Sequence, residues 1–160
     1  MITITVRFFS VLNDFLPHAQ RQRQLMMQVT QQRSIKDILE SIGVPHVEID
    51  RISLHPEGCT AGSDVDFNYH PENNDTFTVY PETHPHTLNG LIPPPPSPFR
   101  FLLDVHLGKL VRLLRLLGFD SYYRNDLTDP VLARLSRAHR RILLTQDRKL
   151  LMRREVSQGL

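Results

Sequence analysis

Two apolar runs, each ending in an aspartate, decide the fold of the second half of this chain: Phe99-Arg-Phe-Leu-Leu-Asp104 and Ile142-Leu-Leu-Thr-Gln-Asp147. Short apolar runs bounded by polar residues are typical of buried parallel strands, and the sequence between these two has helical periodicity. We therefore expect a parallel sheet built from strand-helix-strand units. Because ligands bind beyond the carboxyl ends of the strands in such sheets, Asp104 and Asp147 are expected to lie at a ligand site.

A proline run divides the 160-residue chain into two expected domains. Pro93-Pro-Pro-Pro-Ser-Pro98 cannot join a sheet and is typical of a stiff polyproline II spacer. We predict a first domain over 1–83, a linker over 84–98 and a second domain over 99–160. From residue 99 onward the chain has 13 Lys and Arg against 6 Asp and Glu, whereas the preceding part has 6 against 11. The basic second half favours a polyanionic partner, with a plain solvated surface as the alternative.

Cysteine content and hydropathy exclude several protein classes. Cys59 is the only cysteine, which excludes an internal disulfide framework and a zinc site built from several thiolates. No apolar run is long enough to span a membrane, and the N-terminus lacks the features of a signal peptide. We therefore expect a cytoplasmic protein with no membrane partner.

The first domain alternates short strand patterns with one helix pattern. We predict strands over 2–8, 25–29, 47–54, 65–68 and 76–80, and a helix over 34–42 that Ser34 opens and Gly43 closes. This order is that of an α+β β-grasp domain. The stretches Ile4-Thr-Val-Arg-Phe-Phe9 and Asn73-Asn-Asp-Thr-Phe-Thr-Val-Tyr-Pro81 resemble ubiquitin-like sulfur carriers. These carriers end in Gly-Gly, which this domain lacks where it runs into the linker. We therefore expect the domain to act as an interaction module for a protein partner, as a lid, or as a structural cap for the second domain.

A leucine-rich helix is predicted over 107–118, ended by Gly118. Its predicted buried face consists of Leu107, Leu110, Val111, Leu114 and Leu117. Its other side carries Lys109, Arg112 and Arg115 at every third position. These cations form a stripe suited to RNA phosphates, or alternatively a solvated face.

Carboxylates in the second half suggest a metal site. Asp104 and Asp147 can each cap a helix, but two like charges at one sheet edge also favour a bound cation. Asp126 and Asp129 follow the strand predicted over 121–124, and Asp129 is expected to be the N-cap of a helix that starts at Pro130. Either residue can supply a third carboxylate. Mg²⁺ or Mn²⁺ held by such a cluster suits phosphodiester hydrolysis by activated water.

Three segments give the second half a specific resemblance: Phe101-Leu-Leu-Asp104, Leu107-Gly-Lys-Leu-Val-Arg-Leu-Leu-Arg-Leu-Leu-Gly-Phe-Asp120, and Ile142-Leu-Leu-Thr-Gln-Asp-Arg-Lys-Leu150. They resemble the mutator-seven C-terminal RNase family, which is PIN-like and includes members with a ubiquitin-like domain in front. The resemblance implies a small α/β domain with catalytic acids at Asp104, Asp129 and Asp147. It also implies that Thr145 supports the aspartate of its Thr-x-Asp motif.

The resemblance is to a longer domain. Relatives continue beyond this point with another strand and a cysteine-rich zinc ribbon, whereas no cysteine follows Cys59 here. We therefore expect a C-terminally truncated PIN-like domain without a zinc ribbon. About sixty residues give a marginal core, so this domain is expected to pack against the first domain or form a homo-oligomer.

Three hypotheses about function follow from these observations. The first is a metal-dependent endoribonuclease in which Arg148 and Lys149 join the helix cations in positioning RNA, and His106 contacts a phosphate or a leaving oxygen. The second is a noncatalytic RNA-binding or protein-interaction module with a degenerate PIN-like domain. The third is a phosphatase acting on small substrates, which leaves the basic excess without a role. A histidine metal site involving His70, His84 and His86 is a weaker alternative.

Overall fold

The computed structural model describes residues 1–55, 62–81 and 90–160. The chain forms two compact units, Met1–Leu91 and Ile92–Leu160, each of which is described by itself. Cys59, His84 and His86 lie outside the described residues. Among the described residues, no helix combines the length and apolar character needed to cross a bilayer.

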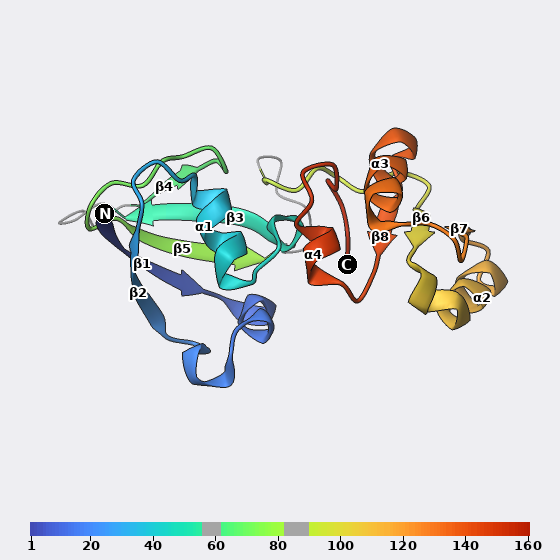
Figure 1. Ribbon diagram of the computed structural model, residues 1–160, viewed down its shortest axis with the longest axis horizontal. Coiled ribbons are helices and arrows are strands. Elements are labelled where there is room, and N and C mark those ends of the chain that lie inside the picture. Colours follow the sequence, from blue (N-terminus) through green and yellow to red (C-terminus); the bar gives the residue numbers. More distant parts are fainter. Residues whose placement is uncertain (56–61, 82–89) are drawn as a thin grey trace. The chain divides into compact units, whose positions relative to one another are not determined.

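The first unit is a mixed five-stranded sheet with one α-helix, as expected for a ubiquitin-like β-grasp domain (Figure 1). Its strands are β1 (Ile2–Phe8), β2 (Gln24–Val29), β3 (Ile49–His55), β4 (Ser63–Val65) and β5 (Thr76–Pro81). Their order in the sheet is β2-β1-β5-β3-β4, and β1 and β5 are parallel while the other neighbours are antiparallel. Helix α1 (Ile35–Ile42) and the 3₁₀ segments η1 (Ser10–Phe15), η2 (His18–Gln20) and η3 (His46–Glu48) complete the unit.

Buried and more exposed side chains alternate along β1, and the buried ones form part of the core of the first unit. Ile4 and Val6 are fully buried, and they pack in the same cluster as Ile38 and Leu39 of α1. A strand with one buried face requires this period of two. Ser34 caps α1 as predicted, because its Oγ accepts a hydrogen bond of 3.2 Å from the backbone N–H of Asp37.

Two predicted strands have different bounds in the structure. The prediction of a strand over 65–68 was wrong beyond Val65, because the Asp66 side chain accepts a hydrogen bond from the Asn68 backbone N–H and turns the chain. β3 begins at Ile49 rather than residue 47, because a 3₁₀ turn follows Pro45. Neither change alters which strands pair.

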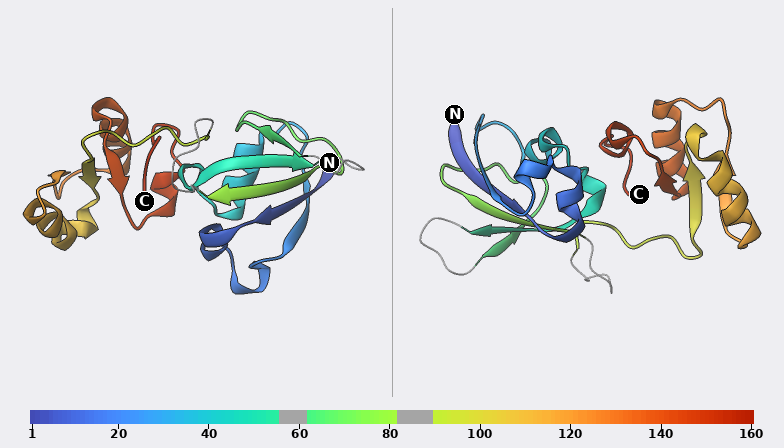
Figure 2. Two further views of the ribbon diagram at one scale, coloured as in Figure 1. Left: turned by 180° about the vertical axis from the view of Figure 1, so that it is seen from behind. Right: turned by 90° about the horizontal axis from the view of Figure 1, so that it is seen from below.

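The second unit is a three-stranded parallel sheet in the order β7-β6-β8. Its elements are β6 (Arg100–Leu103), η4 (Val105–Leu107), α2 (Gly108–Leu116), β7 (Asp120–Tyr123), α3 (Asp129–His139), β8 (Ile142–Leu144) and α4 (Arg148–Leu151). The connection from β6 to β7 and that from β7 to β8 run in opposite directions across the sheet. Right-handed crossovers therefore place α2 and α3 on opposite faces, as the right-hand view of Figure 2 shows.

The last residues of the chain extend this sheet beyond β8. The backbone N–H of Leu143 donates to the carbonyl of Gln158 at 3.1 Å, and that of Thr145 donates to the carbonyl of Leu160 at 3.0 Å. The Gln158 side chain also donates to the carbonyl of Pro93 at 2.6 Å. Residues 158–160 and the start of the proline run therefore belong to the second unit.

Two α-helices end next to glycines with left-handed backbone conformations. Gly43 has φ +108° and Gly118 has φ +85°. After α2, the N–H of Gly118 donates to the carbonyl of Arg115 and the N–H of Phe119 donates to that of Leu114, both at 3.0 Å. This hydrogen-bond pair forms a Schellman motif. The motif requires a positive φ at the residue after the helix, which glycine adopts more easily than residues with a Cβ atom.

The predicted buried face of α2 was only partly correct. Val111 is buried, but Leu110 and Leu117 are exposed, with 73% of Leu117 accessible. Leu113 and Leu116 are exposed as well. α2 packs mainly against β7, an edge strand of a three-stranded sheet, and this narrow surface covers only one strip of the helix.

An ion pair joins the starts of β7 and β8. The Arg141 guanidinium donates two hydrogen bonds to the Asp120 carboxylate, at 2.8 and 2.9 Å, and a third to the carbonyl of Phe101 at 3.2 Å. The hydrogen bond from Arg141 is the main cause that lowers the pKa of Asp120 below its usual value of 3.8. The ionised Asp120 therefore stabilises the folded state at neutral pH.

We expect this contribution to be lost in acid. Because the folded-state pKa is depressed, the stabilisation is complete above the unfolded-state pKa and disappears as the pH falls through the folded-state value. Asp120 is half exposed, so the effect is about 0.2–1 kcal/mol. Urea unfolding at about pH 7 and pH 3 should show that Asp120→Asn destabilises the chain less at the lower pH than at the higher pH. An equal difference at both pH values would contradict the assignment.

Candidate active site

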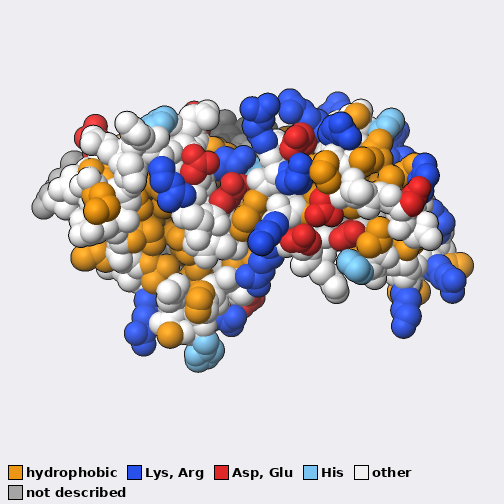
Figure 3. All heavy atoms as spheres, viewed as in Figure 1, with side chains coloured by type: hydrophobic (Ala, Val, Ile, Leu, Met, Phe, Trp, Pro, Cys, Tyr) orange, Lys and Arg blue, Asp and Glu red, His pale blue; other side chains and the backbone are white. Residues whose placement is uncertain are grey.

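Asp104 and Asp147 follow the carboxyl ends of two neighbouring strands, β6 and β8. The loops after these strands leave the sheet side by side, because the chain continues from β6 into η4 and α2, and from β8 into α4. Such a position is where open α/β sheets bind ligands. Figure 3 shows a group of acidic side chains on this unit, between the regions of α4 and α2.

A chain of hydrogen bonds connects the two aspartates through Thr145. The Thr145 hydroxyl donates to Oδ2 of Asp104 at 2.7 Å, and Oγ1 of Thr145 accepts from the backbone N–H of Asp147 at 3.0 Å. Asp104 and Thr145 are 5% and 9% exposed. Thr145 thus fixes the orientation of the Asp104 carboxylate and contacts Asp147 only through its main chain.

Asp104 is a buried carboxylate without a basic partner among the residues that the structure describes. Its Oδ1 accepts a 2.6 Å hydrogen bond from the backbone N–H of Val105, which caps η4. No Lys or Arg side chain among the described residues forms an ion pair with it. A buried anion is costly unless a cation or sufficient hydrogen bonds offset its charge. Two donors leave further lone pairs on the carboxylate available to a ligand.

Asp147 is exposed and acts as the N-cap of α4, as predicted. Its Oδ1 accepts a hydrogen bond from the backbone N–H of Lys149 at 2.8 Å. Its Oδ2 has no hydrogen-bond partner among the residues that the structure describes. The side chain can therefore cap the helix and still offer one oxygen to a ligand.

The two other candidate carboxylates, Asp126 and Asp129, differ in whether a basic side chain already pairs with them. Arg124 holds Asp126 through two hydrogen bonds of 2.9 and 2.5 Å, and this contact is the main cause that lowers the pKa of Asp126. Asp129 has no ion pair within the described parts of the chain. It is the first residue of α3, whereas Thr128 occupies the N-cap position, so the prediction of Asp129 as the N-cap was wrong.

The structure does not collect these carboxylates into a closed cluster. Among the described residues, no group of three or more His, Cys, Asp or Glu side chains is placed to hold a metal ion together. Asp129 is nevertheless expected at the same edge of the sheet as Asp104, since α3 follows β7 and begins beyond the carboxyl ends of the parallel strands. Asp104 and Asp147 remain the pair linked by hydrogen bonds.

The predicted basic residues fall into two groups. Lys109 and Arg112 are exposed on α2, whereas the Arg115 side chain folds back and donates to the carbonyl of Ser121 at 3.2 and 3.0 Å. Arg148 and Lys149 directly follow Asp147 in the first turn of α4. The α4 pair is thus the one that the sequence places next to the acidic site.

His106 and Tyr123 are associated with the turn that follows Asp104. His106 is an exposed residue of η4, two positions after Asp104. Sequence reasoning missed Tyr123, whose hydroxyl donates to the carbonyl of Val105 at 2.9 Å and fixes the turn that follows Asp104. Its position at the end of a strand was the only available signal.

Both units match protein-family models. Residues 1–87 match the model described as Mut7-C ubiquitin, and residues 99–160 match that described as Mut7-C RNAse domain. The solved structure of SAMP1 from Haloferax volcanii is similar at 14% identity with a TM-score of 0.35, covering 51% of this chain and 97% of that chain. No curated protein matches the chain.

Proposed function

Because this chain belongs to the Mut7-C ubiquitin family and carries a Mut7-C RNAse domain, we propose that it is a divalent-metal-dependent endoribonuclease. The observation that carries the proposal is the buried Asp104 carboxylate, which Thr145 orients and no basic side chain of the described residues neutralises. A purely structural cap needs no such burial, since carboxylates commonly cap helices at the surface.

The Asp104 and Asp147 carboxylates suit a hard divalent cation that takes only a few of its ligands from the protein. Asp104 and Asp147 would hold Mg²⁺ or Mn²⁺, because Mg²⁺ commonly binds one or two carboxylates and completes its shell with water and substrate phosphate oxygens. The free Oδ2 of Asp147 and the remaining lone pairs of Asp104 support this fit. When bound, such an ion would activate the attacking water and offset the charge that develops on the phosphate.

The chain's own residues would position the RNA. Arg148 and Lys149 would contact the phosphates beside the scissile bond, because they follow Asp147 in the first turn of α4, and Lys109 and Arg112 would extend the positive surface along α2. Phosphate contacts fix the register of the backbone without reading the bases. Affinity for RNA is therefore expected to fall as the salt concentration rises.

A noncatalytic interaction module remains the competing function. Asp104 and Asp147 both accept backbone hydrogen bonds at helix starts, which is a sufficient structural role for either residue. The ubiquitin-like unit would then recruit a protein partner while the second unit binds RNA without cutting it. This alternative predicts RNA binding of equal strength with and without a divalent ion.

Incubating the purified chain with end-labelled RNA distinguishes these functions. Cleavage is expected with Mg²⁺ or Mn²⁺ and not with EDTA, and a variant with a substituted Asp104, purified in parallel, controls for contaminating nuclease. RNA that stays intact with both ions, while the protein is folded and binds it, would establish the noncatalytic alternative.

Comparing two conservative variants identifies the third carboxylate. Arg124 already neutralises Asp126, whereas Asp129 is not paired with a described basic side chain. We therefore expect Asp129→Asn to slow cleavage about tenfold or more, and Asp126→Asn to change it by less than about twofold. Initial cleavage rates at a fixed Mg²⁺ concentration measure both effects. The reverse ranking would assign the third carboxylate to Asp126.

A further inference from the structure

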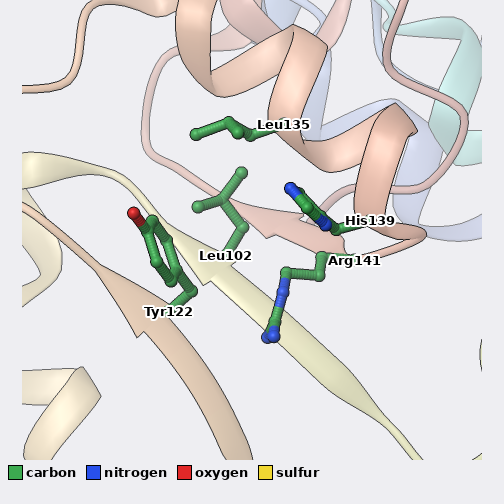
Figure 4. A pocket seen from close by; sticks show the side chains of 5 residues that line it. All are labelled: Leu102, Tyr122, Leu135, His139 and Arg141. Atoms are coloured by element: carbon green, nitrogen blue, oxygen red, sulfur yellow. The ribbon is translucent and has the colours of Figure 1, made fainter.

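A small hollow opens on the α3 face of the second unit (Figure 4). It has a volume of about 220 Å³ and is lined by Leu102, Tyr122, Leu135, His139 and Arg141. α3 contacts β6 and β8, so the Tyr122 side chain on β7 remains partly exposed. The hollow therefore lies between the edge strand and the second half of α3.

The walls of this hollow suit a flat ring. The Tyr122 ring lies on one side, the Leu102 side chain rises from β6 in the middle, and Leu135 lies opposite on α3 (Figure 4). Drug-sized ligands occupy cavities of about 300–1,000 Å³, so this smaller space fits a single ring system. His139 adds ring nitrogens that can form hydrogen bonds to the edge of a ligand.

Charge favours an uncharged ring over a phosphate in the hollow itself. The Arg141 guanidinium is neutralised by the bidentate contact with Asp120 and also lies 5.9 Å from the Tyr122 ring centroid. Arg137 and Arg140 are exposed nearby in sequence, and no acidic side chain of the described residues pairs with them. An apolar, electrically neutral hollow on a unit that carries exposed cations elsewhere matches a base attached to phosphates.

The hollow also lies on the face of the sheet to which Asp104 points. Leu102 and Asp104 are two residues apart in extended backbone, so their side chains share one face and their Cα atoms lie about 7 Å apart. A polynucleotide that passes the acidic site can therefore place a neighbouring base in the hollow.

We propose that this hollow is a nucleobase subsite in which one base of a single-stranded RNA stacks on Tyr122 beside His139. The proposal rests on the endoribonuclease function and specifies its substrate, because a base can enter only when it is unstacked from its neighbours. It predicts that single-stranded segments bind better than duplex RNA.

Equilibrium binding of a fluorescein-labelled single-stranded RNA in EDTA tests the subsite without cleavage. A set of oligonucleotides, each with one abasic position, locates the base that is bound. With the wild-type chain, one abasic position is expected to weaken binding at least about fivefold, as expected for loss of a stacked base. Equal binding by all members of the set would overturn the proposal, and this result requires no variant protein.

A double-mutant cycle then assigns the stacked base to Tyr122. Tyr122→Ala is expected to weaken binding of the intact RNA at least about fivefold and to abolish the further loss at the critical abasic position. Tyr122→Phe keeps the ring and should bind within about twofold of wild type. Phe99→Ala, which removes an exposed aromatic ring outside the hollow, is the matched control and should also bind like wild type. An undiminished abasic effect in Tyr122→Ala would overturn the assignment.

These measurements separate the subsite from the catalytic proposal. Coupling between Tyr122 and one base, without cleavage in Mg²⁺ or Mn²⁺, would support the subsite and refute the endoribonuclease. Metal-dependent cleavage without such coupling would support the enzyme and refute the subsite. Adenosine added as a competitor tests whether the hollow accepts a free nucleoside, and displacement of the RNA by it further supports base recognition.

Discussion

Asp104→Asn is expected to lower metal-dependent RNA cleavage at least about 100-fold while leaving the second unit folded. Asparagine has the same shape and can still accept the hydrogen bond from the Val105 N–H through its carbonyl oxygen. Its amide can donate to Thr145, whose hydroxyl oxygen has a second acceptor site. The substitution therefore removes the buried negative charge and keeps the local packing.

Thermal unfolding provides a readout that does not depend on activity. Mg²⁺ or Mn²⁺ that binds only the folded state raises the melting temperature of the wild-type chain. Asp104→Asn should lose this increase, and in EDTA it should melt at or above the wild-type temperature because an uncompensated buried charge has been removed. Asp147→Asn should show a smaller loss, since its Oδ1 is occupied by the cap of α4.

Two results would contradict this interpretation. Unchanged cleavage by Asp104→Asn would show that the buried carboxylate is only a helix cap. Equal metal-induced stabilisation of the wild type and of both variants would place the ion elsewhere. Asp126→Asn serves as a matched control, because it also removes one carboxylate of the same unit.

Thr145→Val is expected to have the second largest effect, because one hydroxyl group serves two partners. The substitution removes the 2.7 Å hydrogen bond to Asp104 and the acceptor for the Asp147 N–H, while keeping the β-branched shape. Leaving buried polar groups without partners costs about 1–3 kcal/mol. We expect this loss in the free energy of unfolding and a 10- to 100-fold lower cleavage rate, as is typical when a group that orients a metal ligand is removed.

Thr145→Ser is the matched control for this prediction. Serine keeps the hydroxyl, so urea unfolding and cleavage rates should both stay closer to wild type than in Thr145→Val. A Thr145→Ser variant that is as impaired as Thr145→Val would show that the methyl group matters more than the hydrogen bonds. A Thr145→Val variant that is less stable but fully active would limit Thr145 to a structural role.

The sequence supported accurate predictions wherever a local pattern determines local structure. The alternation in residues 2–8 predicted strand β1 correctly, and Ser34 and Gly43 marked both ends of α1. The apolar runs before Asp104 and Asp147 gave two parallel neighbours of one sheet. Predictions failed at Asp66 and at Leu117, where a side-chain turn and the width of the sheet determine the outcome.

The sequence alone determined which residues stand at strand ends and helix starts, because strand alternation and helix capping depend on neighbours a few positions away. The tertiary structure decided which of these residues meet. Thr145 contacts a carboxylate 41 positions earlier, and the hollow beside Tyr122 exists because α3 leaves the edge strand β7 uncovered. Contacts between distant segments arise only when helices and strands pack together, and no local pattern encodes the space that remains between them.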